Sequence, residues 1–389
     1  MSLALRVLDR LDEVTAEQWD ALLPSGNPFV SHAFLAGLER YGCLRESWGW
    51  QPRHLALFRG SRLCAAVPSY VKTNSHGEFV FDHAWAHAMA RAGLNYYPKL
   101  LVASPYSPVV GPRLLAGRGE EAPSLAQALV EAVRGQRDTL GFSSAHLLFL
   151  QGADCATCDE ADAGQWVARQ DVQFHWRNRG WTDFDEFLGA LKHKKRKNIR
   201  SERAQVAQSD LQLEWRHGCS LDDQEWAQVH ALYEDTFDAH GNHAALTPAF
   251  LRHLGASLPG AVWLALARHR GAIVAMAFYL SSSDTLYGRY WGSRINVPGL
   301  HFELCYYRGI EYCLSAGLQR FEPGAQGEHK LARGFIPVFT QSRHAIAHPG
   351  LRQAVAEHLA IERVQVAAYR SELLLHSPYS TPVAPDTDP

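Results

Sequence analysis

The feature that most constrains the fold is a hairpin pattern that occurs once in each half of the chain. Residues 55–60 read Leu-Ala-Leu-Phe-Arg-Gly, and residues 264–271 read Leu-Ala-Leu-Ala-Arg-His-Arg-Gly. A second apolar run follows each of them, at 63–70 and at 272–280. Two apolar runs joined by a short connection that contains Gly predict a β-hairpin. The sequence therefore predicts a duplicated α/β unit and not a solenoid, whose repeats are far shorter.

A second pair of similar segments closes a helix in each half. Residues 92–98 read Ala-Gly-Leu-Asn-Tyr-Tyr-Pro, and residues 316–323 read Ala-Gly-Leu-Gln-Arg-Phe-Glu-Pro. Gly is the usual residue just after a helix, because it adopts the left-handed backbone that ends the helix at no steric cost. We therefore expect the two helix ends to be equivalent and each to lead into a strand.

The length of 389 residues exceeds what one hydrophobic core usually holds, so two domains are expected. We place the boundary near residue 170, which predicts an N-terminal domain over 1–170 and a C-terminal domain over 171–376. Residues 377–389 contain four Pro and no apolar periodicity. This composition predicts a disordered tail.

Composition excludes several classes of protein. The 38 Lys and Arg residues nearly balance the 40 Asp and Glu residues, so no global charge attracts nucleic acid or a membrane. No apolar run approaches 18 residues, so no transmembrane helix is expected. Seven scattered Cys and the lack of a signal peptide favour the cytoplasm. Cys155 and Cys158 form an isolated CxxC pair; we predict neither a metal site nor a permanently bound cofactor.

Lysine is rare in this chain, and four of the seven lysines lie within residues 192–197. The spacing of the apolar residues Leu188, Leu191, Ile199 and Val206 predicts one basic helix over 185–206 with a single buried face. Basic side chains occupy its other faces. They are either simply solvated or bind an anionic substrate or carrier, and the candidate contacts are Lys194, Lys195 and Lys197.

Seven segments together resemble a known family. They are residues 81–86 (Phe-Asp-His-Ala-Trp-Ala), 96–100, 111–113, 194–200, 286–292, 301–303 and the long segment 321–335. The sequence resembles the N-acyltransferases related to the Fem enzymes, which are built from two acetyltransferase-like (GNAT) domains. The resemblance implies an α/β fold with mixed sheets in two tandem GNAT-like domains. It also implies transfer of an acyl group to an amine.

In a GNAT domain two parallel strands separate, so that the pantetheine of a CoA thioester pairs with exposed backbone and a helix N-terminus receives the pyrophosphate. The corresponding strands here are 285–292 and 319–323, with a helix over 301–316 between them. The usual Gln/Arg-x-x-Gly-x-Gly/Ala loop is missing, since residues 293–300 offer Arg294 and Gly299 without that spacing. The donor therefore stays open: acyl-CoA leads, followed by acyl carrier protein or aminoacyl-tRNA.

The candidate site residues surround the loop 324–330, where two glycines permit close approach of the backbone. Transfer from a thioester to an amine needs a base for the amine proton and donors for the developing oxyanion. The candidate catalytic residues are Glu322, Glu328, His329 and Glu303. The candidate binding residues are Lys330, Arg333, His301, Arg294 and the alternating residues Tyr287, Arg289 and Trp291, which we expect on one face of their strand.

The leading hypothesis is a cytoplasmic N-acyltransferase that moves an acyl group from a small-molecule thioester to a primary amine without a covalent enzyme intermediate. A tRNA-dependent aminoacyl transferase shares the fold and differs in its donor. A third hypothesis, from another class, is a noncatalytic scaffold that holds an anionic ligand or RNA through the basic helix.

Overall fold

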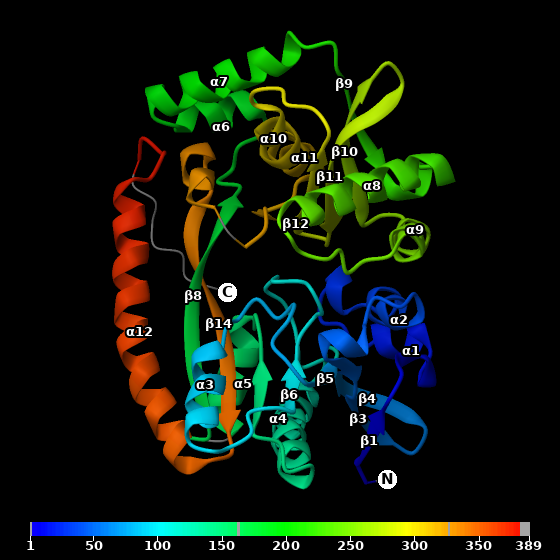
Figure 1. Cartoon of the computed structure of the whole chain (residues 1–389), viewed down its shortest axis with the longest axis vertical. Coiled ribbons are helices and arrows are strands. Elements are labelled where there is room, and N and C mark those ends of the chain that lie inside the picture. The colour runs from blue at the N-terminus through cyan, green and yellow to red at the C-terminus, as the bar shows by residue number, and fades with distance from the viewer. Residues whose placement is uncertain (1, 162–163, 326, 382–389) are drawn as a thin grey trace. The chain divides into compact units, whose positions relative to one another are not determined.

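The computed structural model describes residues 2–161, 164–325 and 327–381, and the chain divides into two compact units (Figure 1). Within the described ranges, the first unit comprises residues 2–172 and 339–369, and the second comprises 173–338 and 370–381. The chain thus first passes between units close to the expected boundary. The expected C-terminal domain, 171–376, is not one continuous stretch, because residues 339–369 return to the first unit.

The first unit holds two sheets. Strands β1, β3 and β4 form a three-stranded antiparallel sheet, and β2, β5, β6, β7 and β14 follow one another in a larger sheet. Its elements are β1 (Ala4–Leu8), α1 (Ala16–Asp20), α2 (His32–Arg40), β2 (Trp50–Pro52), β3 (His54–Arg59), β4 (Arg62–Val67), β5 (Ser69–Lys72), α3 (His83–Arg91), β6 (Lys99–Val102), α4 (Ala122–Thr139), β7 (Ser144–Leu147) and α5 (Gly152–Ala161).

Helix α4 covers the core of the first unit. Its apolar residues recur at helical spacing, so that Leu125, Leu129 and Val133 lie on one buried face. They pack into a cluster that also contains Leu100 of β6 and Leu147 of β7. This packing holds β6 and β7 together beneath the helix.

The second unit is built on a sheet with the strand order β8-β13-β12-β11-β10-β9. Strands β8 (Trp166–Arg177) and β14 (Ile336–Ile346) and helix α12 (Pro349–Leu375) have residues in both units. The other elements are α6 (Phe184–Ala190), α7 (His193–Ala207), β9 (Gln212–His217), α8 (Asp223–Ala239), α9 (Pro248–Ser257), β10 (Val262–His269), β11 (Ala272–Ser281), β12 (Thr285–Ser293), α10 (Leu300–Phe302), the π-helical turn η5 (Glu303–Tyr307), α11 (Arg308–Ala316), β13 (Arg320–Glu322) and the 3-10 helix η6 (Glu328–Arg333).

Both expected hairpins are confirmed. The β3–β4 hairpin turns at residues 60–61, and the β10–β11 hairpin turns at residues 270–271. Gly60 and Gly271 both have positive φ, which matches the turns that a right-twisted hairpin prefers. Each hairpin also carries one register shift, close to the turn.

Each unit contains a strand, a helix and a parallel neighbouring strand, in that order. In the first unit these are β6, α4 and β7; in the second they are β12, the continuous helix from α10 to α11, and β13. The fold class is confirmed as mixed α/β with two tandem GNAT-like units. The expected equivalence of the two helix ends is wrong. Gly93 precedes β6, the first strand of its parallel pair, whereas Gly317 precedes β13, the second strand of its own pair.

The expected single helix over 185–206 is also wrong, because two helices occupy this segment. Leu191 has extended backbone at the end of α6, and Lys192 is the N-cap of α7. The two residues pair instead with the C-terminal segment, through a bridge from Leu191 to Tyr379 and a hydrogen bond from Lys192 N to the Pro378 carbonyl. This pairing interrupts the helix in the middle of its apolar pattern.

The first residues of the expected tail are ordered. Tyr379 is 4% exposed, its hydroxyl donates to the Gly334 carbonyl over 2.6 Å, and its ring stacks on Trp181. Pro378 and Tyr379 are therefore buried within the second unit. The remainder of the expected tail lies outside the described residues.

Candidate active site

The parallel strands β12 and β13 pair over three residues each and then separate. The pairs are Thr285–Arg320, Leu286–Phe321 and Tyr287–Glu322. The next residues are Gly288 and Pro323, and a Cβ atom at Gly288 would lie 3.3 Å from the Pro323 Cα. Pro323 has no N–H to continue the ladder. The ladder between β12 and β13 therefore ends at Tyr287 and Glu322; further along β12, the Trp291 carbonyl accepts a hydrogen bond from Thr236 Oγ1 of α8 over 2.8 Å.

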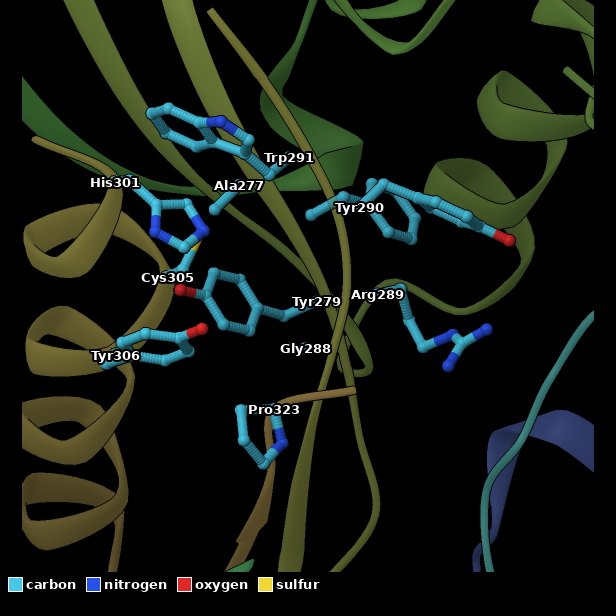
Figure 2. A pocket seen from close by; sticks show the side chains of 11 residues that line it. Ala277, Tyr279, Gly288, Arg289, Tyr290, Trp291, His301, Cys305, Tyr306 and Pro323 are labelled. Carbon is cyan, nitrogen blue, oxygen red and sulfur yellow. The ribbon is translucent and has the colours of Figure 1, made fainter. Parts of the chain in front are cut away.

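A β-bulge redirects the side chains of β12 at this point. Gly288 pairs with Tyr279 and Tyr290 pairs with Phe278, so that Arg289 is an extra residue in the strand. Arg289 and Tyr290 project away from the helix, whereas Trp291 lies on the helix side (Figure 2). The expectation that Tyr287, Arg289 and Trp291 share one face is therefore wrong, because the bulge interrupts the alternation.

The helix opposite β12 begins at Gly299, which has a φ of 84°. A side chain here would be strained, and its Cβ would lie 2.8 Å from the Glu202 carbonyl oxygen of α7. The helix then contains the π-helical turn η5. Such turns are frequent at functional sites because they shift side chains around the axis. Here His301, Cys305 and Tyr306 all point towards β12 (Figure 2).

A small cavity lies where β12 and β13 separate. Its volume is about 80 Å³, and we call it the splay cavity. Tyr279 from β11 and Trp291 from β12 face Cys305 and Tyr306 from the helix. The lining residues are Ala277, Phe278, Tyr279, Gly288, Arg289, Tyr290, Trp291, His301, Cys305, Tyr306 and Pro323. Of the expected site residues, Arg289, Trp291 and His301 are among those that line the splay cavity.

Two imidazoles and a phenol form a connected group at the helix side of the splay cavity. The Tyr306 hydroxyl and His329 Nε2 are 2.8 Å apart, and the His301 ring lies 5.2 Å from Trp291 and 6.0 Å from His329, centroid to centroid. Burial, followed by the nearby cations, lowers the pKa of His301 to about 4. Burial also lowers the pKa of His329. Both rings are therefore neutral at pH 7, so His329 can accept a proton.

Lys330 is a buried ammonium beside this group. It is 3% exposed, and its Nζ donates to the Gly324 carbonyl over 2.7 Å. Within the described ranges it forms no ion pair with an acidic side chain. Burial lowers its pKa to about 8, and its charge acts on the Cys305 thiol that lines the splay cavity. Lys330 therefore supplies positive charge to the cavity at neutral pH.

Arg333 connects the loop to helix α7 and does not line the splay cavity. Its guanidinium is 2.6 Å from Glu202 Oε1, donates to the Tyr307 hydroxyl and to the His329 carbonyl, and stacks on Phe302 at 3.2 Å. The Tyr307 hydroxyl also donates to Glu202. Helix α7 is thereby fixed against α10 and η6, as Figure 1 shows for α7 and α10.

Glu303 does not face the splay cavity as expected. Its carboxylate accepts two hydrogen bonds from Arg203, at 3.0 and 3.1 Å, and lies 3.2 Å from Arg308 Nε. It lines a different groove, against α7. Burial raises its pKa, while Arg203 opposes that shift. The geometry indicates a carboxylate that holds two arginines and not a base for the amine.

The other expected site residues lie apart from the splay cavity. Glu322 is buried at the end of β13, next to Tyr287, and Glu328 is exposed at the start of η6. Arg294 Nε donates to Asp235 of α8 over 2.6 Å. On α7, Lys194 and Lys197 are exposed and Lys195 is half-buried.

Tyr306, Cys305 and Tyr279 were missed by sequence analysis. Cys305 and Tyr306 lie four and five residues after His301. A spacing of five does not place two side chains on one face of a regular α-helix, but the π-helical turn brings Tyr306 to the same face as His301 (Figure 2). The bulge at Arg289 has no evident sequence signal. Helical spacing from His301 alone indicates Cys305 as a neighbour.

The equivalent position in the first unit is closed by the chain itself. Beyond β6 and β7, Leu148 N donates to the Val102 carbonyl over 3.0 Å. Gly111 N then donates to the Phe149 carbonyl over 3.1 Å, and Gly111 forms a parallel bridge with Leu150. The chain therefore bridges its parallel strands in the first unit, whereas β12 and β13 stop pairing after Tyr287 and Glu322 in the second.

Comparisons with known proteins agree with this architecture. The structure is similar to FemX, with 11% identity, a TM-score of 0.53 and coverage of 90% of this chain and 100% of that one. It is also similar to a domain described as the C-terminal part of a lysylphosphatidylglycerol synthetase from Agrobacterium fabrum. That match has 15% identity, a TM-score of 0.52 and coverage of 89% and 95%. At these identities both likenesses concern the fold.

A comparison with curated proteins gave no match. Across the described helices, none has both the length and the apolar character needed to cross a bilayer. The FemAB-like family model, described as peptidoglycan biosynthesis/recognition, matches residues 10–381. This family match supports a transferase that acts on amino groups. The chain belongs to the FemAB-like family.

Proposed function

We propose that this protein is an N-acyltransferase that moves an acyl group from acyl-CoA to a primary amine by direct attack at the splay cavity. The observation that carries the proposal is the separation of β12 and β13 at Gly288 and Pro323, beside a helix N-terminus. The strand edge at such a separation can accept an extended ligand by backbone pairing. The two amides of pantetheine suit such an edge.

The donor's phosphates have two sources of positive charge in this arrangement. The helix from α10 to α11 begins with N–H groups that have no partners inside the helix, and its dipole favours anions there. Helix α7 contacts α10 and carries the exposed Lys194 and Lys197. We therefore assign these lysines to the phosphates of the donor, which acts as a co-substrate and not as a permanently bound cofactor.

The reaction needs one proton acceptor and stabilisation of one negative charge. The amine nitrogen attacks the thioester carbonyl carbon, the C–N bond forms, and the C–S bond breaks as the thiolate leaves. In our proposal His329 accepts the amine proton, with its ring held by the Tyr306 hydroxyl. The Lys330 ammonium stabilises the developing negative charge. The proton finally neutralises the thiolate.

The test is a steady-state assay of the full chain with propionyl-CoA and a panel of primary amines, which follows both free thiol and N-acyl product. We expect product with a 1:1 ratio of thiol to amide. His329→Ala should lower kcat by about 10²-fold or more with little change in KM, as expected for loss of a general base. The control is His87→Ala, an exposed histidine of α3. No amide with any amine would contradict the proposal.

Helix α7 also favours a second candidate, a tRNA-dependent aminoacyl transferase. Its exposed lysines could bind the phosphates of an RNA as well as those of CoA. The same assay with aminoacyl-tRNA as donor separates the two. Transfer from aminoacyl-tRNA and not from acyl-CoA would favour this candidate, and RNA binding without any transfer would favour a noncatalytic scaffold.

A further inference from the structure

We propose that the splay cavity selects an acyl group that is small and carries no positive charge, so that donors with an α-ammonium group are excluded. This inference rests on the proposed function, because it assumes that acyl transfer takes place at this cavity. It concerns the chemical class of the donor's acyl group, which the family and the fold leave open.

The side chains that face into the splay cavity offer no counterion for an ammonium group. Tyr279, Trp291, Cys305 and Tyr306 face one another across it (Figure 2). Its lining residues, all within the described part of the chain, include no Asp and no Glu. The one charged lining residue, Arg289, points its guanidinium away from the helix side. An ammonium placed here would lose its hydration without gaining a carboxylate.

A positive charge already lies beside the splay cavity. Lys330 is buried and makes no ion pair with the described acidic residues, whereas the nearby Arg333 is neutralised by Glu202. Two like charges repel each other, and they do so more strongly the less water lies between them. The same field acts on His301, whose pKa is lowered first by burial and then by His329, Arg333 and Lys330. A second cation in the cavity meets this repulsion.

The aromatic side chains do not form an open cage that would compensate a bound cation for the repulsion by Lys330. Cation–π recognition needs ring faces directed at the cation. The His301 ring meets Trp291 at 74° and Tyr306 at 79°, so these rings pack edge against face. In each of these pairs the edge of one ring covers part of the face of the other. The wall that they form suits a neutral apolar group.

The volume indicates the length of acyl chain that the splay cavity can enclose. A cavity of about 80 Å³ is roughly half the size of the apolar cavity of about 150 Å³ that admits benzene. An acyl group of about two to four carbon atoms fits this space. Acetyl, propionyl and butyryl groups meet both conditions.

The test compares propionyl-CoA with alanyl-CoA, which have the same carbon skeleton and differ by one α-ammonium group. With the full chain and one reactive amine, we expect kcat/KM to be at least 100-fold higher for propionyl-CoA. Calorimetric titration with the corresponding non-reactive thioethers should show the same preference in binding. Hexanoyl-CoA should react at least tenfold more slowly than propionyl-CoA.

A pair of variants locates the selectivity in the splay cavity. Cys305→Asp adds a carboxylate to its wall and should shift the ratio of kcat/KM at least tenfold towards alanyl-CoA. Cys305→Asn, which adds a similar volume without charge, should leave the ratio within threefold of the original. If Cys305→Asp does not fold, the ratio of kcat/KM for propionyl-CoA and alanyl-CoA, measured on the unmodified chain, still tests the inference.

The outcomes separate the inference from the function on which it rests. Equal or faster transfer from alanyl-CoA would overturn the inference and leave the transferase intact. Equal selectivity in Cys305→Asp and Cys305→Asn would place the discrimination elsewhere and overturn the assignment to this cavity. Absence of transfer from every thioester would overturn both the function and the inference.

Discussion

Two effects oppose each other at Lys330: burial disfavours its charged form, and a single hydrogen bond compensates for this only in part. Its stem is buried and its ammonium has one carbonyl partner, Gly324 O, so that burial lowers its pKa to about 8. The protonated form is thus disfavoured in the folded protein. Lys330 retains its charge at neutral pH, where the charge is available to a reacting thioester.

Lys330→Met tests this role, because methionine fills a similar volume without charge. We expect kcat/KM to fall by about 10²-fold, the usual loss when one stabilising donor is removed. Lys330→Arg is expected to lower both the rate and the stability, since a larger planar group does not fit a site that is 3% exposed. Steady-state kinetics and thermal unfolding of both variants provide the measurement. Unchanged kcat/KM in Lys330→Met would remove this residue from the mechanism.

The pKa of Lys330 also predicts how stability depends on pH. Between about pH 8 and the usual lysine value of 10.5, the unfolded chain binds this proton and the folded chain does not. Stability rises with pH wherever the unfolded state binds more protons. From pH 8 to pH 10, the free energy of unfolding of the unmodified chain should therefore increase relative to that of Lys330→Met. Denaturant titrations at both pH values measure this, and parallel behaviour would contradict the lowered pKa.

Glu303 illustrates the opposite case, a carboxylate whose burial serves structure. Its side chain is 4% exposed and holds Arg203 and Arg308. Glu303→Gln leaves these arginines without their buried partner, which typically costs about 3 kcal/mol. We expect a corresponding loss in the free energy of unfolding and an unchanged kcat, measured below the thermal transition. A large fall in kcat with normal stability would restore Glu303 as a base.

Helix α7 carries positive charge at its N-terminus, where the helix dipole disfavours it. Its first turn contains Lys194 and Lys195 and no acidic residue, although the N-terminus of a helix favours negative charge. The double substitution Lys194→Gln with Lys197→Gln should therefore stabilise the chain slightly. It should weaken CoA binding by about tenfold at low salt, with a smaller effect as salt rises.

The matched control for α7 is Arg363→Gln, which removes an exposed positive charge from α12. It should change neither CoA affinity nor the salt dependence of binding. Calorimetry at two salt concentrations provides both quantities. If the α7 variant retains the original affinity and salt slope, its lysines are merely solvated.

Among the helices and strands, the sequence predicted those elements that depend on interactions between residues close in the chain. The two hairpins follow from their turn residues and from the apolar runs on either side of the turn. The break between α6 and α7 does not, because it depends on pairing of Leu191 with Tyr379, far along the chain. The bulge at Arg289 and the π-helical turn change which side chains meet, and neither has a distinct local pattern.

The two units carry the same order of strand, helix and parallel strand, but they differ beyond the last paired residues of the parallel strands. In the first unit Gly111 and its neighbours occupy the corresponding position. That unit contains instead a buried ion cluster, in which Lys99 pairs with Glu78 over 2.8 Å and with Asp82. All three side chains are nearly inaccessible to water. We assign this cluster to stability.

Lys99→Met should therefore destabilise the chain without changing its chemistry. Removing one partner of a buried ion pair typically costs 3–5 kcal/mol, because the remaining charges are left uncompensated. We expect a loss of about that size in denaturant unfolding and an unchanged kcat for the folded fraction. A variant that folds as well as the original but lacks activity would show that the first unit takes part in the reaction.

The division of the whole chain was only partly predictable. The boundary near residue 170 follows from length and from the repeated pattern, whereas the return of residues 339–369 to the first unit depends on contacts distant in sequence. The similar segments at 92–98 and 316–323 were misleading, because the first unit contains β5 and α3 between its hairpin and its parallel strands. Short similar apolar segments recur in a sequence more often than the same topology does, so their similarity alone does not establish equivalent positions in the fold.

The central claim is that an acyl thioester binds where β12 and β13 separate. The most direct measurement is a crystal structure of the full chain with a non-reactive propionyl-CoA thioether. The account predicts pantetheine paired with the backbone of β12 beyond Gly288 and the propionyl group between Trp291, His301 and Tyr306. A ligand bound in the first unit, or bound in the second unit with the splay cavity empty, would contradict it.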